Sequence, residues 1–150
     1  MRPLIILAAL IVAILQVSIM AHMEFLGGIP NLAIAIGVTL FMYRRRSASF
    51  WFLVSSGLFI DLLAPASPGF FTAGAFALYG VLALITSRIE PSPFVALVGA
   101  GLGTLVVDLV WMVKARAVTA GLVEAGYTVI LTAVLLVVAL WLIKEERIAI

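Results

Sequence analysis

Residues 44–69 read RRRSASFWFLVSSGLFIDLLAPASPG and contain one complete predicted membrane span with a clear boundary at each end. Three arginines, residues 44–46, precede the span, and the Pro- and Gly-containing turn 65–69 follows it. The residues between, 47–64, hold a single charged side chain, Asp61. A membrane-spanning helix needs roughly 20 mostly apolar residues, so this stretch predicts one crossing of a bilayer.

The composition of the whole chain agrees with this interpretation. Of its 150 residues, 65% are hydrophobic and 11% charged, and its mean hydropathy is +1.32. Soluble domains are about 45–50% apolar and about 25% charged, so the solvent of this chain must be lipid. These figures argue against a disordered chain, a nucleic-acid-binding module and a disulfide-stapled scaffold. The chain has no cysteine, which removes thiol catalysis and thiolate metal sites.

Charges and Pro/Gly breaks divide the chain in the same way along its length. They predict an all-α membrane protein, a compact bundle of six transmembrane helices with short loops, forming one domain over residues 1–150. The predicted spans are about 3–21, 25–43, 47–64, 70–87, 94–113 and 119–143. Residues 144–150 are left as a short tail.

The basic residues predict the orientation, because Lys and Arg near span ends stay on the cytoplasmic side. With six spans, one side holds seven of the nine and the other side two. The seven are Arg2, Arg44, Arg45, Arg46, Arg88, Lys144 and Arg147. Both termini are therefore predicted to be cytoplasmic.

Two aspartates lie inside predicted spans, where a carboxylate is costly and usually marks an interior or functional position. Asp61 follows Arg46 by 15 residues, and Asp108 follows Pro93 by the same number. At 1.5 Å per residue, both lie about 22 Å from the cytoplasmic edge. The sequence around them also repeats at an offset of 47 residues, which predicts that spans 3–4 and 5–6 are related helical hairpins.

Three interpretations of these aspartates remain open. In the first, each is satisfied locally: Asp61 bonds exposed backbone of the turn 65–69, and Asp108 pairs with Lys114 or Arg116. In the second, they bond a partner's membrane helix. In the third, they bind a small polar ligand or a proton in the outer half of the membrane.

Other single residues carry specific expectations. Gly57, one turn before Asp61, shares its face and could admit a neighbouring helix backbone beside the carboxylate. Gln16 is the strongly polar residue inside span 1 and needs a hydrogen-bond partner there. Asn31 opens span 2 as a cap for backbone amides. Glu124 is interpreted as a solvated outer residue.

Small residues four apart permit close approach of membrane helices. Three spans contain such pairs, which leaves self-association of the chain open. The pairs are Ala9 and Ala13, Ala73 and Ala77, and Gly99 and Gly103.

No catalytic pattern is present in the sequence. It has no nucleophile elbow, no metal-ligand cluster and no phosphate-binding glycine loop. The sequence therefore predicts a protein that is not an enzyme and that uses no cofactor or metal.

Residues 57–63, GLFIDLL, followed by Ser67-Pro68-Gly69, resemble the G-x-x-x-D-L-x turn-G signature of the MreD family of bacterial rod shape-determining membrane proteins. Further similarities are Gln16 late in span 1, Pro30-Asn31-Leu32 opening span 2, and Val106-Val107-Asp108-Leu109 in span 5. Chain length and short loops are also similar, so the resemblance covers nearly the whole chain.

The resemblance implies a non-enzymatic component of the cell-elongation machinery in the bacterial cytoplasmic membrane. It implies binding to MreC, a bitopic protein whose bulk is periplasmic, and indirect association with MreB, RodA and a class B penicillin-binding transpeptidase. We expect a groove of small residues, around Ala9 and Ala13 or around Gly57, to hold the MreC membrane helix.

The alternative is a substrate-binding S component of an energy-coupling-factor vitamin transporter. Six helices in a short chain and an Ala-x-x-x-Ala pair in span 1 are also similar to that family. Such a binder should carry more polar and aromatic groups in its outer half than this chain does.

Overall fold

The computed structural model describes residues 2–18, 28–43, 46–64, 69–115 and 118–148, with side chains throughout except in 108–115, at 118 and in 142–148. The described residues form six helices. They are α1 (Arg2–Ser18), α2 (Leu32–Met42), α3 (Arg46–Leu63), α4 (Phe70–Arg88), α5 (Pro93–Ala115) and α6 (Val118–Ile148). The predicted all-helical class is confirmed.

Charge and Pro/Gly breaks predicted the bounds of α3, α4 and α5 to within two residues. Proline and glycine decide two of these bounds. Pro93 is the first residue of α5, where its missing N–H leaves no bond unmade. Gly69, at the start of α4, has a φ of +86°, a left-handed conformation that favours glycine.

The second predicted span is wrong over residues 28–31, which lie outside the helix, while 25–27 lie outside the described residues. Helix α2 begins after Asn31, whose side-chain oxygen accepts from the Ile34 N–H at 3.1 Å. Pro30 disfavours helical backbone in the residue before it, so the helix cannot extend back through the hydrophobic residues there. The remaining 11 residues are about 16 Å long, roughly half of a bilayer core.

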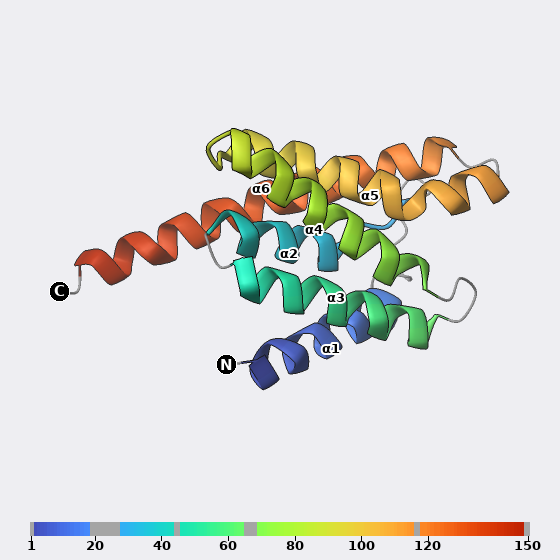
Figure 1. The fold of residues 1–150 in the computed structure, drawn as a ribbon, viewed down its shortest axis with the longest axis horizontal. Coiled ribbons are helices and arrows are strands. Elements are labelled where there is room, and N and C mark those ends of the chain that lie inside the picture. Colours follow the sequence, from blue (N-terminus) through green and yellow to red (C-terminus); the bar gives the residue numbers. More distant parts are fainter. Residues whose placement is uncertain (1, 19–27, 44–45, 65–68, 116–117, 149–150) are drawn as a thin grey trace.

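The last helix is longer than predicted, because α6 continues through residues 144–148, which were expected to be a tail. Charged residues mark the end of the hydrophobic run, but Lys, Glu and Arg are good helix formers. Figure 1 shows α6 extending beyond the other helices at the end where the chain finishes.

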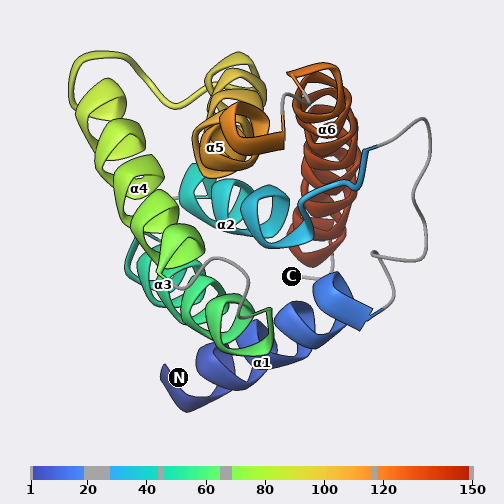
Figure 2. The same ribbon diagram turned by 90° about the vertical axis from the view of Figure 1, so that its right-hand side faces the viewer.

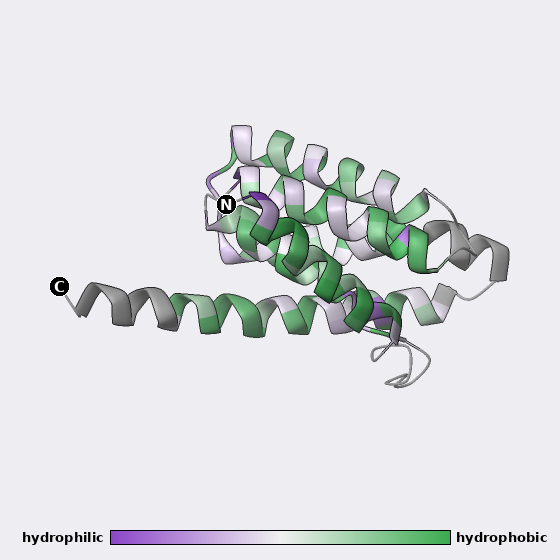
Figure 3. Ribbon diagram, turned by 90° about the horizontal axis from the view of Figure 1, so that it is seen from below, coloured by the Kyte–Doolittle hydropathy of each residue, from purple (hydrophilic) through white to green (hydrophobic). Residues whose placement is uncertain are grey.

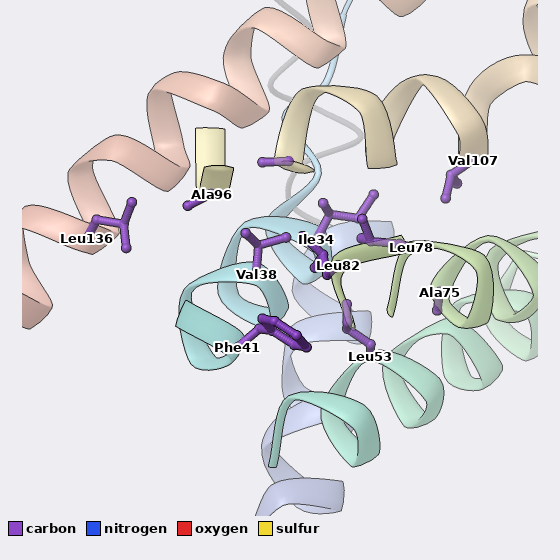
Figure 4. Packing of buried hydrophobic residues seen from close by; sticks show 11 residues of the cluster. Ile34, Val38, Phe41, Leu53, Ala75, Leu78, Leu82, Ala96, Val107 and Leu136 are labelled. Carbon is purple, nitrogen blue, oxygen red and sulfur yellow. The ribbon is translucent and has the colours of Figure 1, made fainter. Parts of the chain in front are cut away.

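Helix α2 lies in the middle of the bundle and contacts α1, α3, α5 and α6 (Figure 2). Most of its side chains are buried, which fits a helix that is apolar on all sides. Figure 4 shows Ile34, Val38 and Phe41 of α2 among Leu53 of α3 and Leu82 of α4. The central position explains why α2 can be short, since most of its side chains are buried against other helices.

Three of the described helical segments are long and apolar enough to cross a membrane: Arg46–Leu63, Phe70–Arg88 and Thr119–Trp141. Large apolar side chains point outward on several helices, including Leu4, Leu84 and Ile130, each more than 60% exposed. In Figure 3, hydrophobic colour covers much of the outer helices and strongly hydrophilic colour is confined to short stretches. The chain therefore has the surface of a membrane protein.

The ribbon places the basic helix ends together. The beginnings of α1 and α3 and the ends of α2, α4 and α6 lie at one end of the bundle, which we call the basic end (Figure 1). Arg2 begins α1, Arg46 begins α3 and Arg88 ends α4. We call the opposite end the capped end.

The two hairpins of the predicted repeat are both present, because α3 packs on α4 and α5 packs on α6. Their junctions differ. Helix α3 ends two residues after Asp61, whereas α5 continues seven residues beyond Asp108, to Ala115. The side chains of Asp108, Lys114 and Arg116 lie outside the described residues, so the expected ion pair is not tested.

Candidate functional site

Two groups of polar side chains lie at the capped end, and both bond the free backbone amides where a helix begins. The first N–H groups of a helix have no partner within it. We call the group at the start of α4 the α4 cap and the group at the start of α2 the α2 cap. The members of the α4 cap are Gly57, Asp61, Phe71 and Thr72. The members of the α2 cap are Gln16, Glu124, Thr128 and residues 29–34.

In the α4 cap, the Asp61 carboxylate reaches from α3 to the beginning of the next helix. Its Oδ1 accepts from the Phe71 N–H at 3.1 Å, and its Oδ2 accepts from the Thr72 N–H at 2.9 Å and the Thr72 hydroxyl at 2.6 Å. Gly69, at the N-cap position, has no side chain to do this. Asp61 is 8% exposed and takes that role from the preceding helix. Of the three interpretations, the structure supports the local one for Asp61, but the amides that it binds belong to the first turn of α4 and not to the expected turn 65–69.

Gly57 allows the backbones of α3 and α4 to approach closely beside Asp61, as its position one turn before Asp61 predicted. A β-carbon added at Gly57 would lie 2.9 Å from the Phe71 carbonyl oxygen and 3.0 Å from the Thr72 Cα. Both are backbone atoms and cannot rotate away. Only a residue without a side chain therefore lets α3 and α4 come this close beside the carboxylate.

In the α2 cap, three neutral side chains each bond one backbone amide at or near the start of the helix. The Asn31 N–H donates to Thr128 Oγ1 at 2.8 Å, the Leu32 N–H to Gln16 Oε1 at 2.8 Å, and the Ile34 N–H to Asn31 Oδ1. Gln16 Nε2 also donates to the Pro30 carbonyl oxygen at 3.1 Å. The expected partner of Gln16 and the expected capping by Asn31 are confirmed. Together these bonds connect α1, the start of α2 and α6.

The interpretation of Glu124 as a solvated residue is wrong. Its Oε1 accepts from the Ile29 N–H at 3.0 Å, and its side chain is half-buried. A β-carbon at Gly28 would lie 2.9 Å from the Glu124 backbone nitrogen, so α6 packs directly on this non-helical segment. The Ile29 N–H lies before the start of α2 and would otherwise be unpaired, so the Glu124 carboxylate supplies its acceptor.

The first pair of small residues expected to hold a partner helix, Ala9 and Ala13, lies inside this chain. Ala9 and Ala13 are fully buried among Val12, Ala33 and Phe52 inside this chain. Small residues let α1 pack closely on its neighbours, so their surface is already used and is not free for another protein.

The pair of small residues in α4, Ala73 and Ala77, faces outward. Ala73, Ala77 and Gly80 are exposed, and a β-carbon added at Gly80 would meet nothing within 4 Å. By contrast, Gly99 and Gly103 of α5 are covered by Leu82 and Leu78 of α4. The pairs of small residues therefore differ in burial, which their spacing in the sequence cannot reveal.

Neither Thr128 nor the role of Glu124 is predicted above from the sequence. A signal was present, because residues 124, 128 and 132 are polar, four apart and on one face of an otherwise apolar helix. Two of them, Thr128 and Thr132, are fully buried. Three polar positions on one face of a hydrophobic helix indicate that the face is turned inward.

The α4 cap and the α2 cap have a structural role. One side-chain oxygen of each of these five residues accepts a hydrogen bond from a helix start or from the segment before it: Gln16, Asn31, Asp61, Glu124 and Thr128. Among the described residues, no three His, Asp or Glu side chains lie close enough to hold a metal ion. The cavity beside Gly57, Ile60 and Phe71 has a volume of about 10 Å³, enough for a single water at most.

Comparisons of the chain with known protein families, with characterised proteins and with solved structures gave no match.

Proposed function

We propose that this chain is a non-enzymatic membrane scaffold of the MreD type, which binds the membrane helix of an MreC-like bitopic partner. In this proposal it contributes to cell-shape control in the bacterial cytoplasmic membrane, crossing it six times with both termini inside. MreB, RodA and a class B penicillin-binding transpeptidase are its indirect partners. The resemblance around Asp61 and Gly69 supports the family. The outward face of α4 supports the binding mode.

The outward face of α4 is the observation that carries the binding mode. Ala73, Ala77, Gly80 and Leu84 are spaced four, three and four residues apart, so they form one exposed stripe. Phe70 and Val81 lie on one side of this stripe and Phe76 on the other, and all three are more than 40% exposed. A shallow channel of small residues between larger ones is the surface on which membrane helices pack closely.

The polar groups support a scaffold over an enzyme or a transporter component. Asp61, Gln16, Asn31 and Glu124 all bond the backbone of their own chain. A vitamin-binding component would need polar groups directed into a cavity of ligand size. The small volume beside the α4 cap favours the scaffold.

The test is retention of the partner by variants of the α4 face. The tagged chain is co-expressed with an MreC-like bitopic protein, purified in mild detergent, and both proteins and small molecules are identified by mass spectrometry. We expect Gly80→Leu to lower recovery of the partner about tenfold, because a large side chain fills the channel. Gly126→Leu is the matched control, since Gly126 of α6 is also exposed with nothing within 4 Å.

Cross-linking gives the second measurement, because the chain has no cysteine of its own. Ala77→Cys should form a disulfide with single cysteines along one face of the partner helix, and Gly126→Cys should not. Equal recovery for both leucine variants would remove the α4 face from the proposal. Recovery of an ATPase pair, a coupling subunit and a bound vitamin would instead establish the transporter alternative.

A further inference from the structure

A groove opens at the basic end between α1, α2 and α3, far from the two caps. It has a volume of about 980 Å³, at the upper end of the roughly 300–1,000 Å³ of small-molecule sites. Most of its lining is apolar, and two arginines and a tryptophan lie at its mouth. The apolar lining includes Ile5 and Ala8 of α1, Ile36 and Leu40 of α2, and Phe52 of α3.

The two arginines of the groove come from different helices. Arg2 begins α1 and lies over the Trp51 ring, with 5.5 Å between its guanidinium carbon and the ring centre. Arg46 begins α3 and lies over the Phe41 ring at 5.6 Å, with one N–H donated to the Thr86 hydroxyl at 3.4 Å. Both arginines line the groove, and most of their N–H donors have no acceptor among the described residues.

The positive charge at the mouth is not neutralised by the described part of the chain. Neither arginine has a carboxylate partner among the described residues, and no acidic residue lies in the first turn of α1 or α3. The exposed N–H groups of two helix starts add to the positive potential there. Ser47, at the same mouth, offers a hydroxyl.

We propose that this groove binds one anionic phospholipid. The phosphate lies between Arg2 and Arg46, and an acyl chain occupies the apolar groove between α1, α2 and α3. Charge complementarity decides the occupant: lipid tails alone would fill any apolar groove, whereas two guanidinium groups without a carboxylate partner in the described part of the chain select a negatively charged headgroup.

The experiment measures lipid affinity of the purified full chain, delipidated and titrated with phosphatidylglycerol or phosphatidylcholine in native mass spectrometry. We expect phosphatidylglycerol to bind roughly tenfold more tightly. The double variant Arg2→Gln with Arg46→Gln should lose that preference. Arg88→Gln is the matched control, because Arg88 is an exposed arginine at the end of α4 that does not line the groove.

Two further variants keep the test independent of folding defects. Arg2→Lys with Arg46→Lys retains both charges and should retain most of the preference. Ala8→Phe places a ring in the apolar lining and should weaken both lipids. Equal binding of the two lipids by the unmodified chain, or an equal loss in Arg88→Gln, would overturn the proposal. Since no partner protein is present, the result does not depend on the scaffold function.

Discussion

The α4 cap and the α2 cap solve the same problem at the same end of the bundle with different chemistry. Each supplies acceptors to amides that a helix start leaves free. The α4 cap uses one carboxylate, Asp61, which is 10 and 11 residues from the amides it binds. The α2 cap uses three neutral side chains together with the Glu124 carboxylate, and the Asn31–Thr128 bond joins residues 97 apart.

This difference in sequence distance decides what each cap stabilises. The α4 cap closes one hairpin, so its loss should loosen α3 against α4 and leave other contacts in place. The α2 cap joins three separate helices around the central one. The bonds made by Gln16, Asn31 and Thr128 are individually weaker because these groups are neutral, but they fix the relative positions of α1, α2 and α6.

The largest expected effect comes from removing the carboxylate. Asp61→Ala removes three hydrogen bonds and leaves the Phe71 and Thr72 amides without acceptors, which should lower the free energy of unfolding by about 3 kcal/mol. Asp61→Asn keeps the shape and one carbonyl oxygen, so it should lose less. Denaturation of the reconstituted protein, followed by tryptophan fluorescence, measures both. Equal stability of Asp61→Ala and the original chain would contradict the capping role.

A methyl group at Gly57 comes next. Gly57→Ala should lower the free energy of unfolding by about 1–3 kcal/mol, because the added carbon meets backbone of α4 that cannot rotate away. Gly80→Ala is the control, an exposed glycine of α4 with open space around it, where alanine should be neutral or stabilising by up to about 1 kcal/mol. Similar losses in both variants would mean that helix propensity, not the close approach, controls the result.

The α2 cap can be tested by comparing two buried threonines of α6. Thr128→Val removes the acceptor of the Asn31 N–H and should cost about 1–2 kcal/mol of unfolding free energy. Thr132→Val is the same change one turn later at an equally buried site. The Thr132 hydroxyl donates only to the Thr128 carbonyl of its own helix, so we expect a loss below about 0.5 kcal/mol. Thermal unfolding followed by circular dichroism separates the two; indistinguishable values would show that Thr128 does not act between helices.

The smallest expected effect is at Glu124. Glu124→Ala removes the acceptor of the Ile29 N–H at a half-buried position, which should cost about 0.5–1 kcal/mol. Glu124→Gln keeps an acceptor oxygen and should stay close to the original chain. The same denaturation assay applies. If Glu124→Ala has no effect, the residue behaves as a solvated one after all.

Local sequence was sufficient for the α4 cap. Gly57, Asp61 and Gly69 belong to one hairpin, and their spacing along α3 and its turn already places a carboxylate beside a close helix approach. Hydrogen bonds over 10 or 11 residues leave few arrangements to choose from. Pro93 and Gly69 predicted where α5 and α4 begin for a similar reason, because proline and glycine affect the backbone at their own positions.

Sequence alone also determined the helical class, the membrane-protein composition and the capping by Asn31, because these follow from residue type and local spacing. Only the tertiary structure decided that α2 is central and short, that Ala9 and Ala13 face inward while Ala77 faces outward, and that Thr128 and Glu124 meet the start of α2. The physical reason is that apolar residues look alike to lipid and to a protein core. Hydropathy marks which segments leave water, whereas packing between distant segments decides which of their faces meet each other.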